Sequence, residues 1–309
     1  MTDEVLRVEN LVKDFGSFRA VGSVSFVVPK GKVIGLLGPN GAGKTTTINI
    51  LLGITTATSG KVSYFGKDFE THKPEILQKI NFASAFNTLQ GRITVWENLI
   101  VFAMLYGMTN YKKRVLELVE YFEITDLLAK KYQDLSAGQK TRVNLIKSLI
   151  NDPEMILMDE ATASLDPDIA DKTLTLIEQL KLDRNLTLLY TSHDMNEITR
   201  ICDEVIFLDH GKIVAQDTPL GLTKKISTAT LRLTFDKNKD LLEKYLRNKH
   251  CSYLFVEEHV VEIVTEEVLL PKLIFGISEA GIWLTNIDVE KPTLEDVFLQ
   301  IARGGKNVH

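Results

Sequence analysis

The chain of 309 residues, 44% hydrophobic and 25% charged, is long enough for one large and one smaller globular domain. Its net charge of −5 excludes the overall basic field that holds nucleic acid, so no nucleic-acid partner is expected. The two cysteines, Cys202 and Cys251, make neither a zinc site nor a disulfide framework, and they fit a reducing compartment. Residues 3–4 are acidic, whereas a secretory signal needs positive charge followed by an apolar core. The longest apolar stretch, 99–108, is about half the length of a membrane span. We therefore expect a soluble, cytoplasmic protein that reaches a membrane only through a partner.

The first part of the chain predicts short strands separated by turns. Apolar residues at 6–12 and 24–28 predict two strands, and the segment 14–16 between them places Phe15 beside a turn glycine. A fully apolar strand is predicted at 33–37, and a helix is predicted at 45–52. The glycine-rich segment between this strand and this helix is therefore in the position of a strand-to-helix loop.

That loop has the sequence GPNGAGKTT, which matches G-x-x-x-x-G-K-[ST] in the strand–helix setting of a phosphate-binding loop. Its glycines tolerate positive φ, so successive N–H groups can turn toward an anion at the positive end of the following helix. Lys44 would add a charge near the β- and γ-phosphates of ATP, and the Thr45 hydroxyl would be a ligand for Mg²⁺. The alternative is a simple glycine turn with a solvated lysine. The predicted ATP-binding residues here are Gly38, Pro39, Asn40, Gly41, Ala42, Gly43, Lys44, Thr45 and Thr46.

A helical subdomain is predicted at about 90–150, where apolar residues follow three-to-four spacing in three successive segments. The third helix, 139–150, is preceded by Ser136-Ala137-Gly138-Gln139. Ser136 and Gln139 have the spacing of a capping box, and a serine at a helix N-terminus can also bind an anion. Both interpretations remain open at this point.

Buried strands alternating with helices predict an α/β core with a largely parallel sheet. The strand at 155–158 is apolar on both faces, and 186–190 and 205–208 predict further buried strands. The first of these ends in Asp159 and Glu160, at the sheet edge where ligands bind in α/β proteins. There Asp159 can hold Mg²⁺ and Glu160 can act as a general base, whereas a strand followed by an acidic helix cap is the simpler alternative.

The remaining residues predict a separate small α+β domain in the order strand-helix-strand-strand-helix-strand, followed by a tail helix at 293–302. A hairpin is predicted across 257–259, and Thr293 has the position of a helix cap. The predicted domains are 1–220, a nucleotide-binding domain, and 221–309, an accessory domain.

Five ordered segments together resemble the motifs of the ATP-binding cassette (ABC) ATPases over about residues 5–218. They are 38–46 (Walker A), 135–139 (signature), 155–160 (Walker B), 163–166 (D-loop) and 191–193 (switch histidine). The resemblance implies a P-loop NTPase cassette with a mostly parallel core, an antiparallel β subdomain and a helical subdomain. The tail, 291–299, is similar to that of export-type cassettes with a C-terminal accessory domain, and an amphipathic helix alone would also explain it.

The resemblance further implies that two chains sandwich two ATP molecules with Mg²⁺. Each ATP would rest on the Walker A loop of one chain and on the signature of the other. Phe15 would stack on adenine, unless it is an ordinary core residue, and His193 would contact the γ-phosphate and the attacking water, unless it only caps a strand. Asp166 would join the two sites. The implied signature residues are Ser136, Ala137, Gly138 and Gln139, the implied catalytic residues are Glu160 and His193, and the implied metal ligands are Thr45 and Asp159.

Two positions depart from the family pattern. Ala137 replaces a glycine of the signature and is expected to raise the cost of positive φ there. Ala85 stands where the family has a glutamine that touches Mg²⁺, and Gln90 is close by but off register. Either Gln90 or water substitutes for that glutamine, or the contact is missing, and we expect slower, still Mg²⁺-dependent hydrolysis.

The leading hypothesis is the ATP-hydrolysing subunit of an ABC exporter. Two copies of the chain would form a homodimer and bind a separate transmembrane permease at the inner face of the membrane. The alternatives are a soluble ABC ATPase without a membrane partner and a regulatory cassette with little turnover. The transported substrate is not encoded in these motifs, because the permease contacts it.

Overall fold

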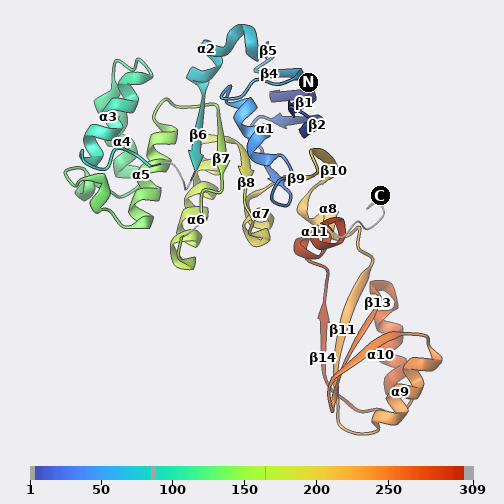
Figure 1. Ribbon diagram of the computed structural model, residues 1–309. Coiled ribbons are helices and arrows are strands. Elements are labelled where there is room, and N and C mark those ends of the chain that lie inside the picture. The colour runs from blue at the N-terminus through green and yellow to red at the C-terminus, as the bar shows by residue number, and fades with distance from the viewer. Residues whose placement is uncertain (1–3, 85–87, 164, 303–309) are drawn as a thin grey trace. The chain divides into compact units, whose positions relative to one another are not determined.

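The computed structural model describes residues 4–84, 88–163 and 165–302 (Figure 1). Its contacts divide the chain into two units, Met1–Pro219 and Leu220–His309. Two residues discussed above, Ala85 and Ser164 of the D-loop segment, lie outside the described residues. In the part of the chain that is described, no helix is both long and apolar enough to cross a membrane.

The first unit is built on a six-stranded sheet with the order β10-β9-β3-β8-β7-β6. All neighbouring pairs are parallel except β9 and β10, so the predicted largely parallel core is confirmed. Every residue of β3 and β8 is buried, which is the burial expected of central strands covered on both faces. The strands are β3 (Val33–Leu37), β6 (Ile80–Ser84), β7 (Met155–Asp159), β8 (Thr187–Thr191), β9 (Glu204–Asp209) and β10 (Lys212–Asp217).

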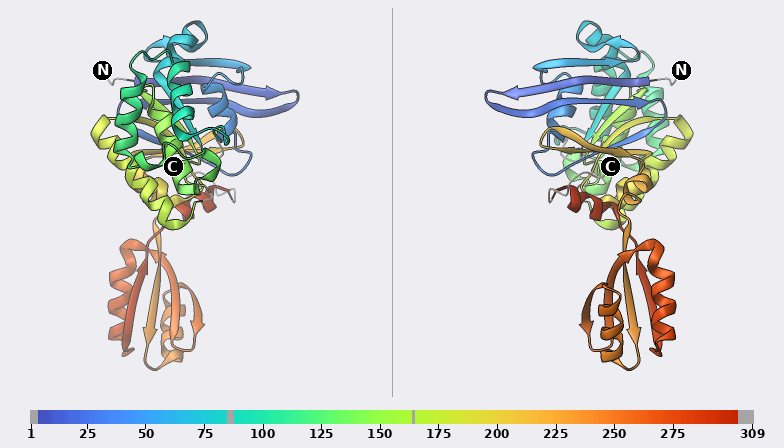
Figure 2. Two further views of the ribbon diagram at one scale, coloured as in Figure 1. Left: turned by 90° about the vertical axis from the view of Figure 1, so that its left-hand side faces the viewer. Right: turned by 90° about the vertical axis from the view of Figure 1, so that its right-hand side faces the viewer.

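A second, antiparallel sheet has the order β2-β1-β4-β5 and shares a core with β3 and α1 (Lys44–Leu51). The first two strands form a long hairpin that is visible in blue (Figure 2). The predicted strands at 6–12 and 24–28 were too short. The hairpin continues through 13–15 and 18–23, where polar residues interrupt the apolar pattern although Ala20 and Val21 are buried. The strands are β1 (Glu4–Phe15), β2 (Phe18–Pro29), β4 (Ser59–Tyr64) and β5 (Lys67–Asp68).

The remaining helices of this unit include the three of the helical subdomain, α3, α4 and α5 (Figure 1). A capping box at Thr94 and Glu97 starts α3. The structure also contains α2 and β6, which the sequence did not predict. The helices are α2 (Phe69–Lys79), α3 (Val95–Leu105), α4 (Tyr111–Tyr121), α5 (Ala137–Leu149), α6 (Pro167–Arg184) and α7 (Met195–Ile201), with short 3₁₀ turns at Thr125–Leu127 and Tyr132–Asp134.

The second unit contains an antiparallel sheet with the order β12-β13-β11-β14. The predicted strand-helix-strand-strand-helix-strand order is observed. Leu231, Leu233 and Phe235 lie buried on one face of β11 and pack with residues of α9 and α10. Thr293 and Asp296 form the hydrogen bonds of a cap at the start of α11. The elements are α8 (Pro219–Thr223), β11 (Thr228–Phe235), α9 (Lys239–Asn248), β12 (Ser252–Glu257), β13 (Val260–Glu266), a 3₁₀ turn (Glu267–Leu269), α10 (Leu270–Glu279), β14 (Leu284–Glu290) and α11 (Leu294–Ala302).

Candidate active site

The loop between β3 and α1 requires glycine at specific positions. Gly38, Gly41 and Gly43 have φ of 151°, 83° and 102°. A Cβ atom at Gly38 would collide with the carbonyl oxygen of Leu208, and one at Gly43 would lie 2.5 Å from the carbonyl oxygen of Ala20. Since these neighbours are backbone atoms, they cannot turn aside as a side chain could, and the loop keeps its shape only with glycine.

The start of α1 is arranged for an anion. This helix begins after Gly43 with no side-chain cap and no acidic residue in its first turn, so no side chain of the first turn neutralises its N-terminal N–H groups. Lys44 is 7% exposed, and its Nζ atom donates to the carbonyl oxygens of Gly38 at 2.6 Å and Pro39 at 3.2 Å. Burial lowers the pKa of Lys44, while the carboxylates of Glu160 and Asp159 oppose that shift. The residues present therefore fit a polyphosphate.

The carboxyl ends of β7 and β8 lie next to each other and fix the two acids. Thr191 at the end of β8 donates its hydroxyl to Asp159 Oδ1 at 2.6 Å. Glu160 has φ of 51°, and its N–H group lies 3.1 Å from both the carbonyl oxygen and the hydroxyl oxygen of Thr191. Thr191 is thus a common hydrogen-bond partner of Asp159 and Glu160.

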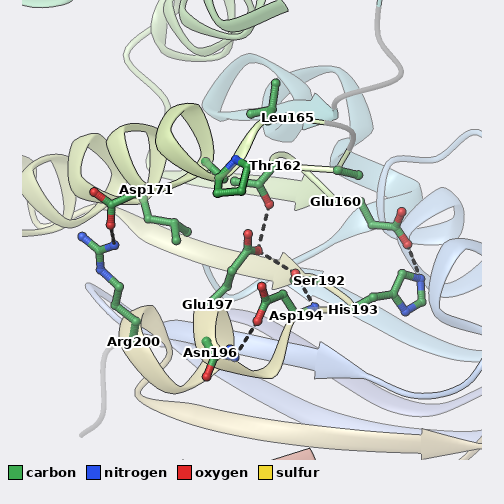
Figure 3. A pocket seen from close by; sticks show the side chains of 14 residues that line it. Glu160, Thr162, Leu165, Asp171, Ser192, His193, Asp194, Asn196, Glu197 and Arg200 are labelled. Carbon is green, nitrogen blue, oxygen red and sulfur yellow. Dashed lines mark hydrogen bonds and ion pairs between the residues drawn. The ribbon is translucent and has the colours of Figure 1, made fainter.

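Glu160 and His193 are in direct contact. Glu160 Oε1 lies 2.6 Å from His193 Nε2, and the two side chains are 22% and 51% exposed (Figure 3). Both line a cavity of about 470 Å³, together with the start of α6 and one face of α7. A carboxylate and an imidazole that touch each other at the edge of a cavity can exchange a proton with a bound water molecule.

The signature segment lines a different cavity from the one that Glu160 and His193 line. Ser136 caps α5, with its Oγ atom accepting the N–H of Gln139 at 3.3 Å, and Gln139 Oε1 accepting the N–H of Ser136 at 3.0 Å. The predicted capping box is therefore confirmed. Ser136, Gly138 and Gln139 line a cavity of about 300 Å³ that includes neither Glu160 nor His193. A Cβ atom at Gly138 would lie 2.7 Å from Ile169 Cγ2, so glycine permits close contact between α5 and α6.

The expected strain at Ala137 is wrong. Ala137 is the first residue of α5, and it is not among the residues with positive φ in the described chain. An alanine at this position has the ordinary helical conformation and a good helix propensity. Its methyl group therefore adds no backbone cost.

Two further predicted residues are exposed. Phe15 is 52% exposed at the tip of the β1–β2 hairpin, with Lys13 Nζ 4.8 Å from the centre of its ring, so it is not a core residue. Asp166 is the residue before α6, and its side chain makes no cap hydrogen bond with that helix. Both side chains are consequently available to a ligand or a partner.

Gln90 is held by its own loop. Its backbone N–H and carbonyl groups bond to the side chain of Asn98 at 3.0 and 2.9 Å, and its Oε1 atom accepts the N–H of Arg92 at 3.5 Å. The amide group is thereby directed back toward the chain. This orientation argues against Gln90 as the substitute for the family's glutamine.

A glycine loop, two strand-end acids and an imidazole at one edge of a parallel sheet define a P-loop nucleotide-binding protein. Residues 21–163 match the sequence family described as ABC transporter. The chain is 31% identical over 306 residues to the linearmycin resistance ATP-binding protein of Bacillus subtilis (strain 168), covering 96% of this chain and 98% of the relative. It is also 31% identical over 304 residues to the Nod factor export ATP-binding protein I of Rhizobium sp. (strain N33), covering 98% of both.

Among solved structures, an ATP-binding cassette of an ABC transporter in its ADP conformation superposes with a TM-score of 0.63 at 28% identity. The match covers 70% of this chain and 91% of that structure. The chain belongs to the ABC transporter family of ATP-binding proteins.

The sequence did not single out several residues of this site. Thr191 was part of the switch-histidine segment but had no assigned role, and Thr162, Tyr190 and Glu197 were not considered. The contacts of Thr162 with Glu197 and of Thr191 with Asp159 join segments more than 30 residues apart, and the contact of Tyr190 with Glu197 joins β8 to α7, so no local spacing indicated them. The hydroxyl groups of Thr162 and Thr191 carried no signal of their own in the sequence.

Proposed function

We propose that this protein hydrolyses ATP in a Mg²⁺-dependent reaction and powers export through a separate membrane permease. The names of its relatives, which include a resistance protein and an export protein, support the transport direction. In this proposal the chain lies on the cytoplasmic side of the membrane and is attached to it through the permease. Hydrolysis follows from family membership, and the residue roles below are proposed.

The observation that carries the proposal is the contact between Glu160 and His193 beside the Lys44 loop. Water attacks the γ-phosphorus of ATP, the bond to the β–γ bridging oxygen breaks, and Glu160 accepts the proton of the attacking water. His193, 2.6 Å from Glu160 Oε1, orients this carboxylate and reaches toward the γ-phosphate. Lys44 and the N–H groups of its loop hold the β- and γ-phosphates, and Phe15 stacks on adenine.

Mg²⁺ would be held by Thr45 and Asp159. The described residues contain no cluster of three or more histidine, cysteine, aspartate or glutamate side chains that could enclose a metal ion by itself. One hydroxyl and one carboxylate fit Mg²⁺ in nucleotide enzymes, because phosphate oxygens and water supply the other ligands. When bound, the ion would neutralise developing charge on the phosphates.

Two copies of the chain would complete two sites. Ser136 and Ala137 are exposed at the start of α5, and Ser136 lines a cavity that excludes the catalytic pair, which supports contact with the ATP of a partner copy. Gly138 and Gln139 would lie at the same interface, and the exposed Asp166 would join the two sites. The γ-phosphate then bridges the copies, and its hydrolysis releases them.

Glu160→Gln tests this proposal. We expect the variant to bind ATP, to lose at least about 100-fold in kcat, and to elute as a dimer in size-exclusion chromatography with ATP and Mg²⁺. Glu154→Gln, a carboxylate-to-amide change at an exposed residue before β7, is the control and should behave like the unsubstituted chain. Lys44→Ala should lose ATP binding, and EDTA should stop hydrolysis. A Glu160→Gln variant with unchanged kcat would refute the assignment of the base, and one that stays monomeric at saturating ATP would refute the sandwich.

A further inference from the structure

Glu197 on α7 is a buried carboxylate whose partners are hydroxyl groups. Its side chain is 6% exposed. One oxygen, Oε2, accepts hydrogen bonds from Ser192 Oγ at 2.6 Å, Thr162 Oγ1 at 2.8 Å and Tyr190 OH at 2.8 Å. Two of these contacts are visible in Figure 3. The nearby cation Arg200 bonds instead to Asp171 and Glu178.

Two of the hydroxyl groups that bond to Glu197 lie close in sequence to the two proposed catalytic residues, Glu160 and His193. Thr162 lies two residues after Glu160, and Ser192 immediately precedes His193. Ser192 Oγ also accepts the N–H of Asp194 at 3.0 Å, so the backbone is held on both sides of His193. A single oxygen of Glu197 therefore links the segment that follows Glu160 to the segment that carries His193.

The bonds to Glu197 are well suited to hold this arrangement. Hydrogen bonds to an ionised acceptor are shorter and about twice as strong as neutral ones, and these three range from 2.6 to 2.8 Å. Burial, followed by the proximity of Glu197, raises the pKa of Tyr190, so this phenol remains a donor. An amide at position 197 would keep the size of the side chain but would be a weaker, uncharged acceptor.

We propose that Glu197 is a positioning residue for ATP hydrolysis, which sets the distance between Glu160 and His193 by binding Thr162 and Ser192 at one oxygen. This inference rests on the proposed function. The buried Glu197 is assigned no contact with the nucleotide in this proposal. Its loss should therefore slow the chemical step and leave ATP binding intact, since a small misplacement of catalytic groups is costly while the Lys44 loop is untouched.

The test compares Glu197→Gln with the control Glu178→Gln. The control is also a carboxylate-to-amide change: Glu178 lies on α6 and forms an ion pair with Arg200, which lies on α7 like Glu197. For the full-length chain we measure kcat, the Kd for ATP and the thermal unfolding midpoint. We expect Glu197→Gln to lower kcat at least about tenfold with Kd changed less than twofold. Glu178→Gln should leave kcat within twofold.

A double-mutant cycle separates positioning from a purely structural role. Ser192→Ala should lower kcat in the same direction, and Glu197→Gln/Ser192→Ala should be no slower than the slower single variant, because both changes break the same link. If Glu197→Gln lowers only the unfolding midpoint, or if the losses in kcat multiply, the positioning role is refuted. If Glu197→Gln does not fold, the Ser192→Ala variant decides alone, and unchanged kcat would refute the inference.

The outcomes also distinguish this inference from the proposed function. If Glu160→Gln abolishes hydrolysis but Glu197→Gln has normal kcat, the proposed function stands and the positioning role fails. If the unsubstituted chain does not hydrolyse ATP, both fail together.

Discussion

Lys147 provides a quantitative test of the structure. It lies on α5, the helix that begins after Ser136, and its Nζ atom is 2.9 Å from the carbonyl oxygen of Phe82 and 3.3 Å from Asn81 Oδ1, both on β6. The ring of Phe102 lies 5.4 Å from the same atom. Burial lowers the pKa of Lys147 from 10.5 to about 8. This ammonium group is thus a contact between the helical subdomain and the edge of the parallel sheet.

The sign of the pH effect follows from this shift. Between about pH 8 and 10.5 the unfolded chain keeps the proton on Lys147 while the folded chain releases it, so the free energy of unfolding rises with pH in this range. A shift of about 2.5 pKa units corresponds to about 3 kcal/mol, and partial exposure to water reduces it to about 2 kcal/mol. Removal of the charge should therefore relieve the free-energy cost of burying the ammonium group, which is present at pH 7 and absent near pH 10.5.

We expect Lys147→Met to be more stable than the unsubstituted chain at pH 7 by about 1 kcal/mol, because the relieved cost exceeds the lost hydrogen bond. The advantage should shrink, and become a deficit, as pH rises toward 10. Urea unfolding at intervals between pH 7 and pH 10 measures the difference, and Lys112→Met, a change at an exposed residue of α4, is the control. A difference that does not vary with pH, or that grows in favour of Lys147→Met, would refute the reasoning.

Three other predictions concern the nucleotide site. Gly38→Ala should weaken ATP binding at least tenfold in a fluorescence titration, because its Cβ atom would meet the Leu208 carbonyl oxygen. The control Gly66→Ala, at a position with open space around it, should bind ATP normally. Equal affinities of the two variants would contradict the requirement for glycine at position 38. Ala137→Gly should leave the steady-state ATPase rate within twofold, since position 137 is helical, and a large gain in rate would mean that the alanine is a real constraint. Gln90→Ala should also leave the rate and the Mg²⁺ dependence unchanged within twofold, because its amide group is directed toward Arg92, and a lost response to Mg²⁺ would restore Gln90 as a candidate ligand.

The parallel core was predictable because its central strands β3, β7 and β8 are mostly apolar. Each of these strands is a run of buried residues followed by a distinct local feature. A glycine-rich loop follows β3, two acids stand at the end of β7, and the polar switch segment stands at the end of β8. The capping box at Ser136 was predictable for a similar reason, because its two partners lie three residues apart. Local patterns of this kind need no knowledge of the fold.

Other features depend on tertiary contacts that no local pattern encodes. The helix α2 contains Pro74 and a non-helical residue, His72, and few of its residues are buried, so its apolar spacing is weak. Edge strand β6 joins the sheet next to β7 through pairing across about 75 residues of sequence. The contact of Glu197 with Thr162 and that of Lys147 with Phe82 likewise form only when distant segments meet. The strain expected at Ala137 is wrong because Ser136 is the N-cap and Ala137 is the first residue of α5, so its φ is not positive.

The pairing of β11 with β14 has a consequence for protein engineering. The first residues of β11 lie opposite the last residues of β14, with Thr230 paired with Glu290, so the chain enters and leaves this sheet at the same end. A segment whose first and last strands start and end side by side can be removed or exchanged as one piece, because a short linker can join the two chain ends that remain. Chimaeras that swap the segment from β11 to β14 between relatives are therefore a practical way to ask what the accessory unit contributes.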